Sequence, residues 1–307
     1  MKLWIRLLRA VVSLWVIVTL VFVGLRLTGD PVLAVLNPDD MTKDMIDTFR
    51  KLWGFEGTIW DQYVVYVVNV SHGHFGTSIL NGQDALRTVF DRLPATLSLV
   101  GLSVLVMILI GIPIGTLAAT RAGSRLDGLV MAGSTFGFAM PNFFFGLLLM
   151  LVFAVLLRML PSGGTGTWAH FIMPVITIGV AKAAIFTRFV RSSVLDALRL
   201  QCVTAARARG FSEAQVYLRY VFPNSLIPVV TMLPLLVGAM ISASAVVESV
   251  FAWPGIGRLL VESVAQRNLS IVQVIIMLVA VVMISTNLIV DLLYGWLDPR
   301  TARGTAH

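Results

Sequence analysis

Residues 204–210 read TAARARG and residues 223–228 read PNSLIP, and both stretches belong to a polar, basic connection that runs from 188 to 228. A long apolar segment lies on each side of this connection. Extra loop length between two membrane spans costs entropy, so spans are usually joined by short loops. A connection of this length therefore indicates a helical excursion out of the membrane, and its small side chains suit the close approach of a soluble partner.

The local pattern of this connection predicts a helix, a glycine turn and a second helix. No Gly or Pro interrupts residues 194–209, and apolar or small residues recur there at helical spacing. Gly210 stands where a glycine commonly ends a helix. Ser212 and Gln215 have the spacing of a capping box that opens the second helix, and Pro223 is expected to close it.

Composition confines the class of protein. Of 307 residues, 57% are hydrophobic and 13% are charged, and the mean hydropathy is +0.88, which is more apolar than a soluble domain needs. Several windows exceed the roughly 20 apolar residues that cross a bilayer as a helix. We place membrane spans near 10–28, 95–119, 129–157, 171–190, 226–247 and 271–296. The predicted fold class is an all-α polytopic membrane protein with six transmembrane helices, a cytoplasmic helix–turn–helix and a small external helical segment.

The basic residues indicate the orientation. With the N-terminus inside, the cytoplasmic pieces hold 13 Lys and Arg residues, whereas the longer external pieces hold 8. This asymmetry follows the positive-inside rule and places both termini in the cytoplasm. The sequence pI near 10.1 then reflects topology and anionic lipid rather than nucleic-acid binding. The single cysteine, Cys202, excludes an intrachain disulfide and is expected to be a small packing residue.

This topology predicts the domain organisation. The chain would comprise an N-terminal transmembrane helix (1–28), an external segment (29–94), a domain with the other membrane spans (95–296) and a cytoplasmic tail (297–307). The helix–turn–helix connection would occupy about 191–225. The external segment is rich in acidic and aromatic residues, and is either an interfacial helical cap or a surface that receives a delivery protein.

Further motifs lie along nearly the whole chain. They are LTGDP at 27–31, RLPATL at 92–97, VVESVFAWPGIGRLL at 246–260, NLIVDLLY at 287–294 and LDPR at 297–300. In this order, and together with TAARARG, they resemble the permease family of bacterial ATP-binding-cassette (ABC) importers, in its peptide/nickel branch. The branch commonly reads Tyr-Val-Arg-Thr-Ala-Arg-Ala-Lys-Gly before its glycine turn, and this chain departs from that pattern at positions 202, 204 and 205.

The resemblance implies a division of labour between subunits. The residues that would couple the chain to an ATPase are Val203, Thr204, Ala205, Ala206, Arg207, Ala208, Arg209 and Gly210. The external mouth of the pathway would be formed by Trp253, Pro254, Gly255, Gly257 and Arg258. Partners would be a second homologous permease in a heterodimer, two ATP-binding-cassette ATPases, a periplasmic or lipid-anchored solute-binding protein and membrane lipids. The chain has no phosphate-binding glycine loop, so ATP and Mg²⁺ would bind the partner subunits and this chain would be neither an enzyme nor a cofactor carrier.

Three polar residues inside the spans are candidates for the translocation pathway: Lys182, Asn142 and Ser242. A charge at the position of Lys182 costs about 2.5–3.5 kcal/mol on insertion scales, so it needs a reason. Its ammonium would meet a carboxylate of the cargo, snorkel to the interface or pair with the partner permease. Asp291 is expected to make a structural contact with Arg188, Arg191 or Arg121 rather than to act in transport. Residues 111–115 (GIPIG) suit close helix packing.

Other classes of protein fit less well. A secondary transporter would show inverted repeats and broken helices, neither of which is evident, and an intramembrane hydrolase would carry catalytic motifs that this sequence lacks. His72 and His74 form a His-x-His pair, but two imidazoles without converging ligands are not a metal site. The cargo stays open among a peptide, a nickel chelate, glutathione and an opine-like conjugate.

Overall fold

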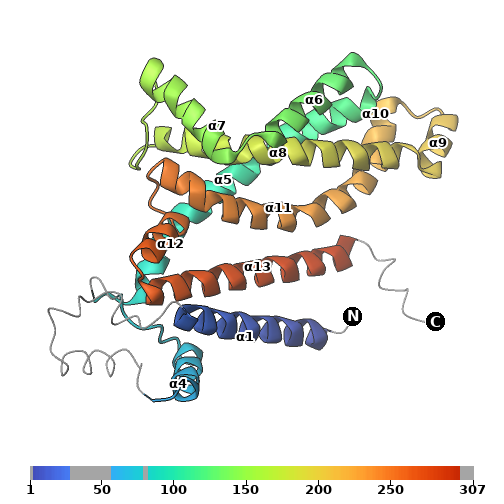
Figure 1. Cartoon of the computed structure of the whole chain (residues 1–307). Helices are drawn as coiled ribbons and strands as arrows, with labels where there is room; N and C mark the ends of the chain where they lie inside the picture. Colours follow the sequence, from blue (N-terminus) through green and yellow to red (C-terminus); the bar gives the residue numbers. More distant parts are fainter. Residues whose placement is uncertain (1–2, 28–56, 79–81, 298–307) are drawn as a thin grey trace. The chain divides into compact units, whose positions relative to one another are not determined.

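The computed structural model describes residues 3–27, 57–78 and 82–297, and the regular elements in those residues are helices (Figure 1). In chain order they are α1 (Leu3–Leu27), α4 (Ile59–Ser71), α5 (Ala85–Thr120), α6 (Arg125–Ala139), α7 (Asn142–Leu149), η2 (Met150–Leu156), α8 (Ala169–Leu198), α9 (Gln201–Ala208), α10 (Glu213–Val216), η3 (Tyr217–Val221), α11 (Phe222–Val250), α12 (Ile256–Ala265) and α13 (Leu269–Leu297). The expected all-α membrane fold is confirmed. Most of the LTGDP motif and the tail beyond 297 lie outside the described residues.

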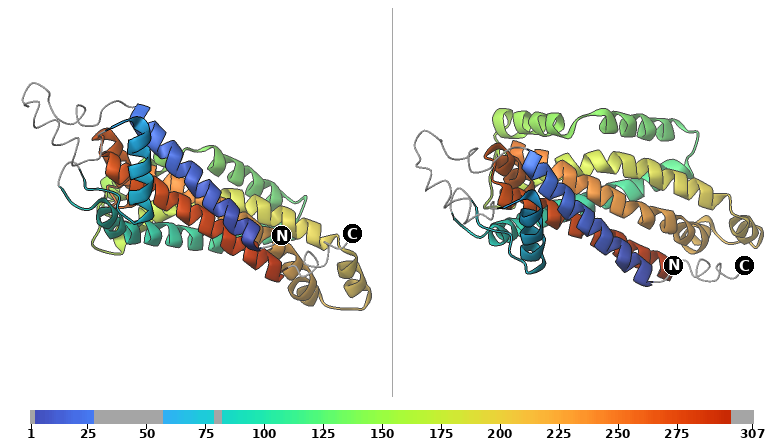
Figure 2. Two further views of the ribbon diagram at one scale, coloured as in Figure 1. Left: turned by 90° about the horizontal axis from the view of Figure 1, so that it is seen from below. Right: turned by 60° about the horizontal axis from the view of Figure 1, so that its bottom comes forward.

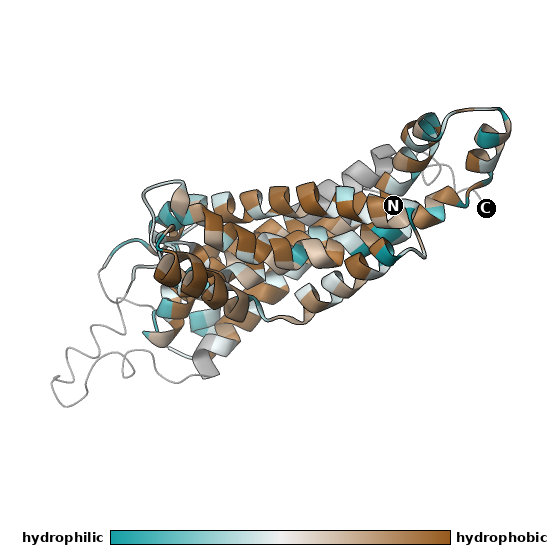
Figure 3. Ribbon diagram, turned by 90° about the horizontal axis from the view of Figure 1, so that it is seen from above, coloured by the Kyte–Doolittle hydropathy of each residue, from teal (hydrophilic) through white to brown (hydrophobic). Residues whose placement is uncertain are grey.

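The long helices account for the predicted spans. Three helical stretches of the described chain are long and apolar enough to cross a membrane: α5, α8 and the continuous helix made by α10, η3 and α11. The bent pair of α6 with α7 and η2 is a fourth, while α1 and α13 contain shorter apolar stretches, Val11–Gly24 and Leu269–Ser285. Figure 3 shows hydrophobic residues along these helices and hydrophilic residues gathered mainly at their ends and loops.

The chain divides into two compact units, Met1–Pro94 with Arg258–Ser285, and Ala95–Gly257 with Thr286–His307. In the first unit, α4 begins with a capping box between Thr58 and Asp61, whose hydrogen bonds hold the pKa of the Asp61 carboxyl below its usual range. The ring of Phe22 on α1 lies 5.3 Å from the rings of both Tyr63 and Tyr66 on α4. These contacts form the small helical segment that the sequence predicts after the first span.

In the second unit, α8 is the central helix, and α6, α7 and α11 all pack on it. Glycines set its closest approach to α5. A Cβ at Gly115 would lie 2.7 Å from the carbonyl oxygen of Thr187, and a Cβ at Gly111 would overlap the ring of Phe186. Phe186 is fully buried. The prediction that residues 111–115 serve close helix packing is therefore confirmed.

The third predicted span, 129–157, is not one straight helix. α6 ends at Ala139, and the following pair of α7 and η2 turns away by 99°. Pro141 is the cause, because a proline disfavours helical backbone in the preceding residue, and Met140 accordingly has an extended ψ of 123°. Figure 1 shows α6 and α7 diverging above α8. Pro141 is a sequence signal for this bend, but the apolar run on both sides of it led to the prediction of a single span.

The glycine contact between α5 and α8 generates a matched test. Gly115→Ala should destabilise the protein by about 1–3 kcal/mol, because the new methyl group would press on the Thr187 backbone. Gly101→Ala on the same helix meets nothing within 4 Å, so it should be neutral or stabilising by up to about 1 kcal/mol through helix propensity. Thermal unfolding in detergent checks both variants. Equal stability of the two would refute the packing argument.

Candidate functional site

The stretch predicted to meet a partner leaves the helical bundle as a short helical hairpin, residues 201–216, made of α9, a turn and α10. The expectation of one helix over 194–209 is wrong, because α8 ends at Leu198 and Leu200 is extended, with ψ 142°. No Gly or Pro marks this break, and the N–H groups of Arg199 and Leu200 close the end of α8 by donating to Asp196 and Ala197. Figure 2 shows the hairpin projecting beyond the ends of α8 and α11.

The turn of the hairpin is a Schellman motif. The N–H of Gly210 donates to the Arg207 carbonyl at 3.0 Å, and the N–H of Phe211 donates to the Ala206 carbonyl at 3.3 Å. Gly210 has φ +81°, a conformation that L side chains rarely adopt. Ser212 and Gln215 then form both bonds of the predicted capping box. The predicted sequence of helix, glycine turn and helix is confirmed.

An ion pair, which the sequence analysis missed, closes the hairpin across its turn. Arg207 donates from Nε and Nη2 to the two carboxylate oxygens of Glu213, each at 2.9 Å. This contact raises the pKa of the Arg207 guanidinium. Both side chains are exposed, so the pair adds little stability, but its two-point geometry orients both groups. The spacing of six residues across a glycine turn was the available signal.

The hairpin has a buried side and an exposed side. Val203 and Ala206 are buried against the rest of the second unit, with exposed fractions of 0% and 2%. The exposed side carries small or polar residues, including Thr204, Ala205 and Ala208. Cys202 is also exposed, so its expected role as a packing residue is wrong. Six of the eight predicted coupling residues are therefore accessible, and four of these have small side chains: Thr204, Ala205, Ala208 and Gly210.

The second helix does not stop at Pro223. It continues from Glu213 to Val250 without interruption, which corrects the expected closure at this proline. The π-helical segment η3 lies immediately before the proline, and such a widened turn accommodates a lost backbone donor. The side-chain amide of Asn224 donates to the Tyr220 carbonyl at 2.6 Å.

The motif at 246–260 includes a cluster of buried, hydrogen-bonded residues at the C-terminal end of α11. The Trp253 indole, 2% exposed, donates to the Ala95 carbonyl at 3.0 Å. The buried Glu248 carboxylate accepts a hydrogen bond from the Thr96 hydroxyl at 2.7 Å, and that hydroxyl accepts one from the Ile256 N–H at 2.8 Å.

The glycines of this motif are required by the same packing. A Cβ at Gly255 would overlap the Glu248 carboxylate, and one at Gly257 would overlap the backbone of Ala245. Pro254, which directly precedes Gly255, is half-buried, and Arg258 pairs with Glu262 one helical turn later. The residues predicted at the external mouth thus include several that the structure buries in the protein interior.

The three predicted pathway residues lie on different helices. Asn142 begins α7, Lys182 lies near the middle of α8, and Ser242 is exposed on α11 with its hydroxyl bonded to the Gly238 carbonyl. No hydrogen bond joins these three side chains in the part of the chain that the structure describes. Lys182 is half-buried and makes no ion pair with any described residue. Its ammonium is therefore an unpaired charge within a predicted span.

Comparisons with known proteins agree with this architecture. Residues 111–303 match the family described as "Binding-protein-dependent transport system inner membrane component". The glutathione transport system permease protein GsiC of Escherichia coli (strain K12) is 36% identical over 295 residues, covering 96% of each chain. The oligopeptide transport system permease protein AppB of Bacillus subtilis (strain 168) is 36% identical over 283 residues, covering 89% of each.

Solved structures show the same fold. The inward-facing MetNI methionine ABC transporter aligns with a TM-score of 0.58 and 17% identity, covering 68% of this chain and 96% of that one. An amino acid ABC transporter crystallised with histidines aligns with a TM-score of 0.55 and 19% identity, covering 68% of this chain and 93% of that one.

The fold and the family match are those of a permease, the membrane-embedded subunit of a transport system. The chain belongs to the family of inner membrane components of binding-protein-dependent transport systems. Permease components of such systems are not themselves enzymes, and nucleotide binding generally lies on partner ATPases. The predicted family, permease function and membrane class are confirmed.

The turn glycine yields a sharp test of the hairpin. A Cβ at position 210 would meet nothing within 4 Å, so a substitution there acts through backbone conformation alone. Gly210→Val should distort the turn, because left-handed backbone costs an L residue about 1–2 kcal/mol and more when it is β-branched. We expect ATP-driven transport to fall at least several-fold while the protein still inserts in the membrane. Gly210→Asn, which tolerates this conformation, should keep most activity. Equal transport by wild type and the valine variant would contradict the prediction.

Proposed function

We propose that this chain is one of two homologous permeases in an importer of short peptides or peptide-like solutes such as glutathione, and that its 201–216 hairpin docks on an ATPase subunit. The observation that carries the proposal is the preorganised hairpin itself, with its Schellman turn, its ion pair and its exposed small side chains. These features reduce the entropy that a docking loop would lose on binding.

Small side chains suit the hairpin to a groove on a partner. Thr204, Ala205 and Ala208 let another surface approach the backbone closely, while Arg199, Arg209 and Arg219 are exposed and make no ion pair with described residues. These guanidinium groups offer charge-assisted donors to acidic side chains of an ATPase. Arg207 contributes through its internal pair with Glu213 instead.

The remaining partners follow from the family. A solute-binding protein would deliver cargo on the outer side, and a second permease would complete the pathway in a heterodimer. The broad apolar surfaces of α6, α7 and η2, with exposed residues such as Phe136, Phe144 and Leu151, would meet lipid or that second permease. Residues 95–296 would form the permease domain, which largely overlaps the stretch that matches the family.

The cargo assignment draws on two observations. Both curated relatives named above carry peptide-type transport functions in their names, one for glutathione and one for oligopeptides. Lys182 adds a positive charge within a span without a carboxylate partner among the described residues. Peptides and glutathione carry carboxylates, so the Lys182 ammonium would stabilise them as they pass the membrane midplane. Asn142 and Ser242 would contribute hydrogen bonds to the same path.

Both termini and the hairpin would lie in the cytoplasm, and the exposed cysteine offers a direct test. A membrane-impermeant maleimide should label Cys202 in inside-out vesicles but not in intact spheroplasts, because the hairpin would face the cytoplasm. In a Cys202→Ala background, Trp60→Cys on the exposed part of α4 should be labelled from outside. Labelling of Cys202 from outside would reverse the proposed orientation.

Reconstituted transport tests both the function and the role of Lys182. Proteoliposomes that contain the two permeases, the ATPases and the binding protein should accumulate a labelled short peptide or glutathione only with ATP. Lys182→Met removes the charge and keeps most of the stem, so it should leave the yield of the complex unchanged and lower uptake several-fold. Lys182→Arg keeps the charge and serves as the control.

Other results would contradict these proposals separately. ATP-driven uptake of neither solute by wild type would refute the cargo class. Full activity of Lys182→Met would refute its pathway role, and a fall in yield or thermal stability would instead indicate a contact with the second permease.

A further inference from the structure

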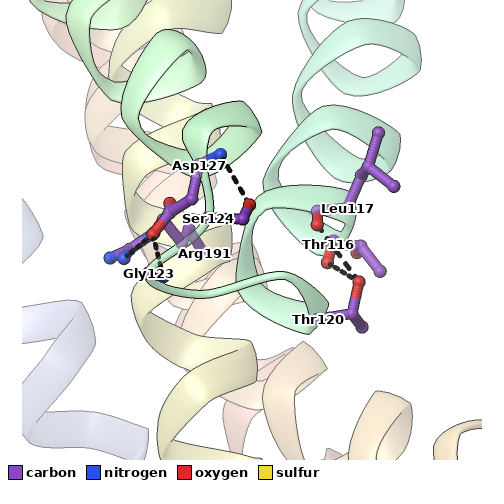
Figure 4. A network of polar contacts seen from close by, with 7 residues as sticks. All are labelled: Thr116, Leu117, Thr120, Gly123, Ser124, Asp127 and Arg191. Carbon is purple, nitrogen blue, oxygen red and sulfur yellow. Dashed lines mark hydrogen bonds and ion pairs between the residues drawn. The ribbon is translucent and has the colours of Figure 1, made fainter.

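A network of polar contacts surrounds the turn between α5 and α6, close to the end of α8 (Figure 4). At its centre, Asp127 in the first turn of α6 is buried, with 5% of its surface exposed. Arg191 on α8 grips both carboxylate oxygens, with Nη2 donating to Oδ2 at 2.7 Å and Nε donating to Oδ1. Asp291 was expected to contact Arg188, Arg191 or Arg121; its side chain lies outside the described residues, so that expectation stays a prediction.

The Asp127 carboxylate also organises its own turn. The Gly123 N–H donates to Oδ2 at 2.9 Å, and Gly123 has φ +80°, which fits a tight turn. The Ser124 hydroxyl accepts from the Asp127 N–H at 3.3 Å and so caps α6. The turn, the start of α6 and the end of α8 are therefore held by one carboxylate.

A second contact joins the end of α5 to the far side of the hairpin. The hydroxyls of Thr116 on α5 and Tyr217 at the start of η3 lie 3.0 Å apart. Thr120, one turn later on α5, donates from its hydroxyl to the Thr116 and Leu117 carbonyls. A small cavity beside this hydrogen bond is lined by Thr116, Tyr217, Val190, Val194 and Ser225 among others.

These two contacts hold the chain on either side of the 201–216 hairpin, about three helical turns before it and directly after it. Arg191 lies seven residues before the end of α8, and Tyr217 follows directly after α10. We infer that the end of α5, with the α5–α6 turn, is a brace that positions the hairpin, and that Arg191–Asp127 and Thr116–Tyr217 transmit hairpin displacement to the spans. The inference rests on the proposed docking of the hairpin on an ATPase.

Asp127 pairs with Arg191 and not with one of the neighbouring arginines, which supports a specific role for the Arg191–Asp127 pair. Arg121, Arg125 and Arg188 are all exposed basic residues near the same end of these helices, and none of them makes an ion pair with a described residue. Only Arg191 is placed to reach the buried carboxylate with two donors. A bidentate ion pair fixes the relative orientation of its two side chains as well as their distance. It therefore suits a rigid link between two helices that move together.

The test is the number of solute molecules transported per ATP hydrolysed by the reconstituted complex. Asp127→Asn preserves shape and removes the charge, and Tyr217→Phe removes one hydroxyl. Each variant should assemble and hydrolyse ATP, but its transport per ATP should fall several-fold, and the double variant should fall further. The charge exchange Asp127→Arg with Arg191→Asp should recover only part of the lost ratio, because it restores the ion pair but not the acceptor for the Gly123 N–H. Arg188→Gln, on the same helix, should leave the ratio unchanged.

The opposing outcomes are distinct. A wild-type ratio in both Asp127→Asn and Tyr217→Phe would overturn the brace, and so would a loss of thermal stability without any change in that ratio. If Asp127→Asn fails to assemble, Tyr217→Phe and the charge exchange decide the question. Failure of the proposed function would appear differently, as a wild-type complex that binds no ATPase or shows no ATP-driven uptake.

Discussion

Close contact between α5 and α8 is the constraint on which the second unit depends. Lipid gives little hydrophobic drive for one helix to pack on another, so backbone proximity and dispersion must hold the bundle together. Gly111 and Gly115 permit that proximity, because a side chain at either position would overlap α8. With α8 held in this way, its neighbours α6, α7 and α11 have a fixed surface to pack on, and its C-terminal end is aimed toward the hairpin.

Irregular backbone appears where this bundle has to turn or to change direction. Pro141 bends the third span, and η2 and η3 interrupt regular α-helix at two further places. Such features are frequent at functional sites. They let a helix change direction while most of its backbone hydrogen bonds are kept. η3 lies between the hairpin and α11, where a change in hairpin position would have to reach the membrane.

The elements that the sequence predicted well were those with strong local signals. Hydropathy located the long apolar helices α5, α8 and α11, Gly210 marked the turn, and the spacing of Ser212 and Gln215 predicted the capping box. The failures had a different cause. The break at Leu200 carries no breaker residue, and it is visible only once α8 and α9 are both packed in place.

Long-range pairs were equally inaccessible to sequence reasoning. Arg191 and Asp127 lie 64 positions apart, and the positive-inside pattern does not say which arginine finds a carboxylate. The WPGIG stretch of the family motif was predicted to line an opening, yet Trp253 is buried and bonded to Ala95. A motif therefore located a special segment correctly without revealing whether its side chains face solvent or the interior.

The ion pair between Arg207 and Glu213 has a consequence for how the hairpin meets another surface. Of the three charged residues in 201–216, two neutralise each other, which leaves Arg209 as the unpaired cation of that stretch. Electrostatic steering accelerates association most when an uncompensated field reaches beyond the screening length, which is about 8 Å at physiological salt. Residues 201–216 would thus be recognised mainly by their shape, and steering toward an ATPase would rest on Arg209 together with Arg199 and Arg219 on either side of the stretch.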